Sequence, residues 1–272
     1  MTKPEPRLEI LIATLNRSSL DFLDVMFQNN DLSKHSILIV NQTTDDCILK
    51  SDQSHIRVIN SFERGLSKSR NLAIDNAIGD ICLLADDDAI YLKDFEKIIL
   101  ESYDNQPQAD VITFKTLTTE NKPFYKYPKK SKSLGAFSEY VLSIEISFKK
   151  DAIKNSKIRY DEQFGLGAMF QDSENYIFLK QLQDHTDLNL YFVSEFIVIH
   201  KPFTSSDEIN SDRFVFARSA LNYKFYKQIA YFWLVKYLLF LLRNKYIGFS
   251  EISTKWKVGL NGIKTYKKLK AN

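Results

Sequence analysis

Three consecutive aspartates, Asp86, Asp87 and Asp88, directly follow the apolar run "ICLLA". Each negative charge makes its neighbours harder to ionise, so three in a row need open solvent or a cation beside them. One interpretation is an ordinary turn, where Asp is common. The other is a site for Mg²⁺ or Mn²⁺, which take oxygen ligands. Because side chains alternate along a strand, the outer pair would face the site, and Asp87 would point away and could be no more than a turn residue.

The residues around the triplet predict the elements that position it. Apolar runs and helical periodicity indicate strands at 8–15, 35–42, 56–61 and 80–88, with helices at 18–30 and 65–77. Strands that alternate with helices predict parallel pairing, with helices on the faces of the sheet. Ligands bind beyond the carboxyl ends of such strands. Polar clusters end three of these strands, at 14–17, 41–45 and 86–88, so one edge of the sheet is predicted to carry the site.

The following residues predict a more mixed arrangement. They indicate a helix at 93–105, a strand at 109–118, a basic aromatic loop at 121–133, a strand leading into a helix at 139–153, a Gly-rich loop leading into a helix at 164–184, and a strand at 190–200. No Pro-, Gly- or Ser-rich linker divides the chain into independent domains. The pattern therefore predicts one mixed α/β fold with a mainly parallel sheet.

Composition places the chain among globular proteins of the cytoplasm. It has 272 residues and is 44% hydrophobic, enough for a substantial core. Its two cysteines, Cys47 and Cys82, lack the spacing of a zinc or redox site, which predicts a reduced protein. The N-terminal residues lack the basic start, long apolar stretch and cleavage site of a signal peptide, so we expect no export.

The C-terminal residues 213–272 differ in charge from the rest. They hold 13 Lys and Arg and one acidic residue, Glu251, whereas residues 1–212 hold 24 Lys and Arg and 33 Asp and Glu. Within them, 229–242 is apolar and aromatic, but a helix of that length reaches only about 21 Å, short of the roughly 30 Å of a membrane core. We expect either an interfacial helix on an anionic membrane or a helix packed on the core; nucleic acid has no accompanying motif.

Three motifs occur in order: "ILIATLNR", "ILIVNQTTDD" and "GLSKSRNLAIDNAIGDICLLADDD". Together they resemble the nucleotide-sugar-binding half of family 2 glycosyltransferases, closely over 8–91 and more weakly through "GLGAMFQDSENYIFL" and "IVIHKPFTSS". The resemblance implies the GT-A fold, a Rossmann-like mixed sheet flanked by helices. It places a catalytic domain at 1–212, with a nucleotide-sugar half at 1–105 and an acceptor half at 106–212, before a basic aromatic helical extension at 213–272.

The resemblance also implies roles for single residues. Nucleotide-sugar contacts fall on Thr14, Asn16, Arg17, Asn41, Gln42, Lys68, Arg70, Asp86 and Asp87. The family usually ends its second strand in an Asp that bonds uracil; the amides here can still bond a base edge but leave its identity open. Arg suits forked recognition of phosphate. Asp88 and Asp86 would bind Mn²⁺ or Mg²⁺, with His200 either a further ligand or a structural residue.

The catalytic base is a second departure from the family. Inverting members use a carboxylate in a Glu-Asp pair to deprotonate the acceptor hydroxyl. Here the pair aligns with Glu174 and Asn175, so the Asp is missing. Glu174 is the first candidate and Asp172 the second. Alternatively, both are solvated residues whose negative charge is stabilised by the positive N-terminal end of the helix dipole.

The resulting hypothesis is a metal-dependent, inverting transferase that uses a nucleoside-diphosphate sugar, first of all a UDP-sugar. Its acceptor would be a saccharide or lipid-linked saccharide in capsule, O-antigen or exopolysaccharide synthesis at the inner face of the cytoplasmic membrane, and a homo-oligomer is compatible. One alternative is a non-catalytic nucleotide-sugar-binding protein with a decayed site. The other is a sugar-nucleotide pyrophosphorylase, although residues 8–17 lack the Gly-rich phosphate loop that it needs.

Overall fold

The computed structural model describes residues 7–135, 140–185, 187–203 and 208–271. The chain forms two compact units. The first unit consists of Met1–Asp161 and Asn175–Pro202, and the second of Glu162–Glu174 and Phe203–Asn272. The division at residue 212 stays a prediction.

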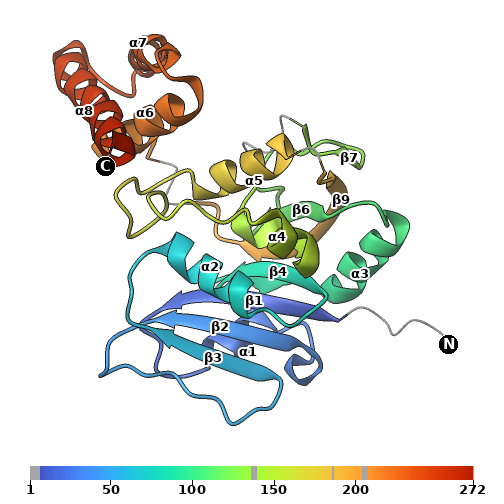
Figure 1. Cartoon of the computed structure of the whole chain (residues 1–272). Coiled ribbons are helices and arrows are strands. Elements are labelled where there is room, and N and C mark those ends of the chain that lie inside the picture. The colour runs from blue at the N-terminus through green and yellow to red at the C-terminus, as the bar shows by residue number, and fades with distance from the viewer. Residues whose placement is uncertain (1–6, 136–139, 186, 204–207, 272) are drawn as a thin grey trace. The chain divides into compact units, whose positions relative to one another are not determined.

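The first unit is built on one mixed sheet (Figure 1). Its strands are β1 (Leu8–Leu15), β2 (Ser36–Gln42), β3 (Ile56–Ser61), β4 (Ile81–Asp86), β5 (Ile90–Tyr91), β6 (Val111–Thr118), β7 (Lys132–Ser133), β8 (Ile146–Lys149) and β9 (Leu190–His200). Their order is β3-β2-β1-β4-β8-β6-β9-β5, with β7 also paired to β9. Strands β3, β2, β1 and β4 pair in parallel, as do β6 and β9. Strand β8 runs antiparallel to both β4 and β6. The sheet is therefore parallel at the half that was expected to bind nucleotide.

Helices cover both faces of this sheet (Figure 1). One core contains α1 (Phe22–Met26) and α3 (Phe95–Asn105), and the other contains α2 (Leu66–Asn76), α4 (Lys150–Ser156) and α5 (Glu174–Asp184). Alternation along β1 explains the two cores, because Leu8, Ile10 and Ile12 join the first and Leu11 joins the second. The predicted α/β fold with a helix-flanked, mainly parallel sheet is confirmed.

Several boundaries differ from the sequence prediction. The strand expected from residue 139, which lies outside the described residues, begins only at Ile146. Two other differences are larger in consequence. The helix expected at 18–30 contains only α1, because the following residues form turns and a 3₁₀ helix at Leu32–Lys34 that Asp31 caps. Strand β4 ends at Asp86 instead of Asp88, so the triplet lies across the strand end and its last two residues turn away from the ladder.

The second unit is helical and depends on two glycines. Its helices are α6 (Asp212–Tyr226), α7 (Ile229–Arg243) and α8 (Ile252–Ala271), with a 3₁₀ turn at Phe249–Glu251. A Cβ on Gly262 would lie 2.2 Å from the Phe216 carbonyl oxygen, and one on Gly259 would lie 2.5 Å from Leu234. These glycines allow α8 to approach its neighbours closely. Within the described ranges, no helix has the length and apolar character needed to cross a membrane.

Candidate functional site

The acidic triplet lies at the edge of the sheet where β1, β2 and β4 end. These three strands are parallel neighbours, so the loops that follow them start side by side. Each aspartate of the triplet has partners from a different segment of the first unit. The three carboxylates are thus separated from one another by their contacts, which reduces their mutual repulsion.

Asp87 connects the triplet to the end of β1. Its Oδ2 accepts hydrogen bonds from Thr14 Oγ1 at 2.5 Å and from Arg17 Nε at 2.7 Å. The Arg17 side chain remains 41% exposed, so part of it is accessible to a ligand. This corrects the expectation that Asp87 is no more than a turn residue: the chain has left the strand at this point, so strict alternation of side chains no longer applies.

The two amides that end β2 are used inside the protein. Asn41 is fully buried; its Oδ1 accepts from the Arg17 backbone N–H at 3.0 Å, and its Nδ2 donates to the Arg17 carbonyl and to Asn60 Oδ1. Gln42 Oε1 accepts from the Gly65 N–H at 2.6 Å. This corrects the expectation that Asn41 offers a base edge its amide, because that amide has no exposed surface. Both residues instead hold the loops in place.

Two further predicted residues lie in these loops. Asn16 has a left-handed backbone (φ 54°), which Asn tolerates, and its Oδ1 accepts from Arg64. Its exposed side chain follows β1 directly. Lys68 pairs with Glu63 at 2.5 Å, and this contact lowers the pKa of Glu63. Lys68 therefore contacts the loop before α2.

Arg70 connects Asp86 to α5. Its Nη2 donates to Asp86 Oδ1 and its Nη1 donates to Asn175 Oδ1, both at 3.1 Å, while its guanidinium lies 5.4 Å from the Tyr160 ring centroid. The second Asp86 oxygen accepts from Ser143 at 2.8 Å. Arg70 is buried, so the ion pair is shielded from water. Arg70 thus contacts the triplet through Asp86, and its predicted role in binding the nucleotide or diphosphate stays a prediction.

Asp88 faces the end of β9. His200 Nε2 lies 3.3 Å from Asp88 Oδ1, and Lys201 Nζ lies 3.7 Å from Asp88 Oδ2. The hydrogen bond from His200 lowers the pKa of Asp88, although burial opposes this. Burial disfavours the charged imidazole, but the hydrogen bond and the charge of Asp88 outweigh it and raise the pKa of His200. Asp88 and His200 thus form a coupled acid–base pair 112 positions apart in the printed sequence.

The Asp88–His200 pair has the chemistry of a partial metal site. His200 Nδ1 donates to the Lys201 carbonyl at 2.8 Å, which orients the ring and leaves Nε2 toward Asp88, as in many metal-binding histidines. Adjacent ligands of an octahedral Mg²⁺ at about 2.1 Å lie about 3 Å apart, close to the observed 3.3 Å. Among the residues that the structure describes, no group of three or more His, Cys, Asp or Glu side chains could hold a metal. The structure does not bring Asp86 into this pair, so the residues fit an ion that takes its other ligands from a bound diphosphate and water.

The two candidate bases have different surroundings. Asp172 is buried, and within the second unit its Oδ2 lies 2.5 Å from Arg218 Nε and accepts from Ser173 Oγ. Both oxygen contacts are made within the protein, so Asp172 has the environment of a structural residue. Glu174 is half-buried and is the first residue of α5, directly before the Asn175 that Arg70 contacts.

Sequence reasoning missed an aromatic group beside His200. Phe124 lies 6.0 Å from the His200 ring and 4.9 Å from Tyr125, which in turn lies 6.0 Å from Tyr140. Tyr140 is 54% exposed. The basic aromatic loop was recognised in the sequence, but nothing local showed that β6 and β9 end together and bring this loop to His200.

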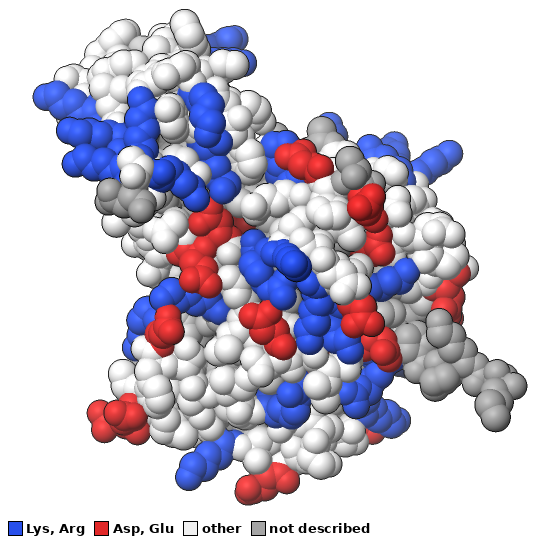
Figure 2. All heavy atoms as spheres, in the orientation of Figure 1, with Lys and Arg blue, Asp and Glu red and all other residues white. Residues whose placement is uncertain are grey.

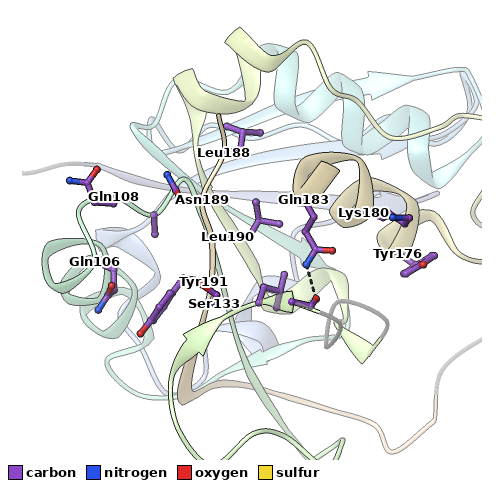
Figure 3. A pocket seen from close by; sticks show the side chains of 13 residues that line it. Gln106, Gln108, Ser133, Tyr176, Lys180, Gln183, Leu188, Asn189, Leu190 and Tyr191 are labelled. Atoms are coloured by element: carbon purple, nitrogen blue, oxygen red, sulfur yellow. Dashed lines mark hydrogen bonds between the residues drawn. The ribbon is translucent and has the colours of Figure 1, made fainter. Parts of the chain in front are cut away.

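A separate pocket of about 620 Å³ lies at the opposite ends of β6 and β9 (Figure 3). Amides and phenols line much of it, including Gln106, Gln183, Asn189 and Tyr191, and Gln183 donates to the Gly135 carbonyl at 2.7 Å. None of the predicted site residues lines this pocket. The predicted chemistry and this pocket therefore occupy opposite edges of the sheet.

Comparisons with known proteins agree with this arrangement. The sequence model of the family described as Glycosyl transferase family 2 matches residues 5–173. No curated protein matches the sequence. Among solved structures, S. aureus TarS 1-349 is 15% identical, with a TM-score of 0.58 and coverage of 96% of this chain and 80% of that one. S. aureus TarS is 16% identical, with a TM-score of 0.58 and coverage of 96% and 49%. TarS 1-349 in complex with UDP-GlcNAc is 14% identical, with a TM-score of 0.56 and coverage of 96% and 80%. At these identities the likeness concerns the fold.

Proposed function

Because the chain belongs to glycosyltransferase family 2, we propose that it transfers a sugar from a nucleoside-diphosphate sugar to a hydroxyl group of a saccharide or lipid-linked saccharide acceptor in cell-surface polysaccharide synthesis. One observation carries the proposal: a single sheet edge gathers Asp87 with Thr14 and Arg17, Asp86 with Arg70, and Asp88 with His200. Such an edge offers hydrogen bonds, a forked cation and metal ligands to one phosphorylated sugar.

The donor is bound by the loops after β1 and β4 in this proposal. Asn16 and the exposed part of the Arg17 side chain contact the nucleotide, with Asp87 fixing the Arg17 side chain. Asn41 holds the loop after β1 from inside, and Gln42 holds the start of α2. A UDP-sugar is the first donor to test, because TarS, which shares the fold, has been crystallised with UDP-GlcNAc.

A divalent ion completes the proposed site. Members of the family commonly use one, and here Asp88 and His200 would hold it. The ion would neutralise negative charge on the diphosphate leaving group. Arg70 holds Asp86, two residues before Asp88, in a fixed orientation.

We assign the general base to Glu174 and an inverting outcome to the reaction. Its position at the start of α5, next to the residue that Arg70 contacts, supports this choice. A carboxylate there would accept the proton of the acceptor hydroxyl as that oxygen attacks the anomeric carbon. The proposed setting is the inner face of the cytoplasmic membrane, which the basic residues 213–272 support.

A donor screen tests the transferase proposal. The purified chain is incubated with a panel of nucleotide sugars, with and without Mn²⁺, and nucleoside diphosphate release is followed. Metal-dependent release from one donor is expected. Formation of a nucleoside triphosphate and a sugar 1-phosphate when pyrophosphate is added would favour a pyrophosphorylase, and binding without turnover in the presence of saccharide acceptors would favour a non-catalytic protein.

A pair of variants tests the base. Glu174→Gln should retain donor binding and lose transfer by roughly 100-fold or more, as expected for a general base. Asp172→Asn, the matched carboxylate change, should mainly lower stability, because it weakens the Arg218 ion pair. Full activity of Glu174→Gln would give the role to another group.

A further inference from the structure

Helix α7 has two apolar faces, and its own unit buries only one of them. Ala230, Leu234, Leu238 and Leu241 recur at helical spacing and are all at most 5% exposed. They pack within the second unit, where α7 contacts both α6 and α8. These residues already supply the apolar stripe that a surface helix needs for packing.

The outward face of α7 is also apolar. Ile229 is 64% exposed, Phe232 77% and Leu239 59%, and Phe240 is 44% exposed beside them. Large apolar side chains at this density on one short helix exceed the scattered exposure that is normal for a protein surface. Exposed apolar side chains grouped on one helix in this way mark a site of contact with another apolar phase or partner.

Cations lie among these apolar side chains. Lys236 and Arg243 lie on the outward side of α7, and Lys245 follows it; all three are exposed, and none has a carboxylate within ion-pair distance in the described part of the chain. The whole segment 213–272 has 13 basic residues against one acidic residue. Figure 2 shows Lys and Arg side chains gathered over the C-terminal helices. Long basic side chains can place their stems along apolar surface and their charges at lipid phosphates.

We propose that α7 lies in the interfacial layer of an anionic membrane. Ile229, Phe232 and Leu239 enter the boundary between headgroups and acyl chains, and Lys236 and Arg243 contact lipid phosphates. A helix of 15 residues is about 22 Å long and lies along the surface in this arrangement. The proposal refines the membrane location given above and depends on no step of sugar transfer.

Charge favours a membrane over the other occupants. A second copy of the chain would bring an equally basic segment against this one, and like charges repel. Nucleic acid would meet the cations but would leave the phenylalanine and leucine side chains without apolar contacts. An anionic bilayer satisfies both features of the face.

Vesicle sedimentation with the full chain, in the absence of any donor, tests the proposal. We expect binding to vesicles of equal parts phosphatidylcholine and phosphatidylglycerol, weaker binding to phosphatidylcholine alone, and partial release by salt. Both tryptophans, Trp233 and Trp256, lie in the second unit, so their emission should shift to the blue on binding. Failure here leaves donor turnover unaffected, so the two proposals fail separately.

Matched variants assign the contact to α7. Phe232→Ser with Leu239→Ser should weaken vesicle binding roughly tenfold or more, because two apolar side chains no longer leave water. Phe62→Ser changes a side chain of the first unit that is 60% exposed and should bind as the unchanged chain does. Lys236→Gln with Arg243→Gln should weaken binding to anionic vesicles only. Circular dichroism confirms that each variant retains its helices.

Three results would overturn the proposal. They are unchanged vesicle binding by the double serine variant, no binding by the unchanged chain, and self-association in solution that the double serine variant abolishes. Sedimentation velocity without vesicles detects the last of these.

Discussion

Arg70 Nη1 lies 3.1 Å from Oδ1 of Asn175, the residue at the second position of the expected Glu-Asp pair. A neutral amide therefore accepts a hydrogen bond from a buried guanidinium at the start of α5. Tyr160 OH donates to the same oxygen at 3.3 Å, so this amide oxygen has two donors. The Asn175 side chain therefore stabilises this region through its acceptor oxygen, which an Asp at this position would also provide.

We expect Asn175→Leu to lower the free energy of unfolding by about 2 kcal/mol, because two donors lose their acceptor in a largely buried place. Urea denaturation measures this. Asn175→Asp, which retains the oxygen, serves as the matched variant and should remain closer to the unchanged chain. Equal losses in both variants would show that the oxygen is not the important feature.

Asp87→Asn should raise the KM for the donor about tenfold, because it weakens the contact that fixes the Arg17 side chain. Thermal stability should change little, since Arg17 is 41% exposed. Asp104→Asn, which changes an exposed carboxylate on α3 to an amide, is the control. A KM that is the same in both variants contradicts the role given to Arg17.

Asp88→Asn should weaken Mn²⁺ binding in the presence of UDP by roughly tenfold or more, because it removes an anionic oxygen ligand. Isothermal titration with Mn²⁺ measures the effect, and donor binding in the presence of a chelator should remain unchanged. Asp52→Asn is the exposed control. An undiminished Mn²⁺ affinity would place the ion away from Asp88.

Glu145 should make stability depend on pH. Burial raises its pKa from 4.5 to about 7, although Tyr127, Thr116 and the Leu142 N–H all donate to it. The folded chain therefore keeps a proton that the unfolded chain loses, so the stabilisation present below pH 4.5 is lost as the pH rises to about 7. The shift in the Glu145 pKa corresponds to a loss of about 3 kcal/mol in the free energy of unfolding across this pH range.

Urea denaturation from pH 4.5 to 7.5 checks this expectation. Glu145→Gln should be less stable throughout, because its amide nitrogen meets donors, but it should lack this pH slope. Glu101→Gln on the exposed side of α3 should retain the slope. A slope that persists in Glu145→Gln assigns it to another group.

Local sequence pattern predicted the strands well because parallel strands buried on both faces are continuous apolar runs. Strands β1 and β3 occupy the predicted ranges, and β9 ends at His200 as expected. Strand order was outside the reach of this reasoning: β8 enters between β4 and β6, and this insertion brings Ser143 to Asp86. Pairings between distant segments depend on the whole fold, and no local period encodes them.

The gathering of polar residues at one sheet edge could be predicted because strand ends concentrate polar residues, whereas their role as a site stays a prediction. The role of each residue was harder to predict, because a carboxylate or amide can form its hydrogen bonds either with a ligand or within the protein. Asn41 shows this: its type suits a base edge, yet burial assigns its hydrogen bonds to the protein. The roles of Glu174, Asp88 and His200 stay predictions that the experiments above test.

The glycines inside α8 reverse a common rule of protein engineering. Replacing glycine within a helix by alanine usually stabilises a protein by up to about 1 kcal/mol, because alanine favours the helix and restricts the unfolded chain. At Gly262 the added methyl would lie 2.2 Å from a backbone oxygen that cannot move aside easily. A programme that stabilises the C-terminal helices by raising helix propensity must therefore leave Gly259 and Gly262 unchanged and choose positions on the outer surface of α8.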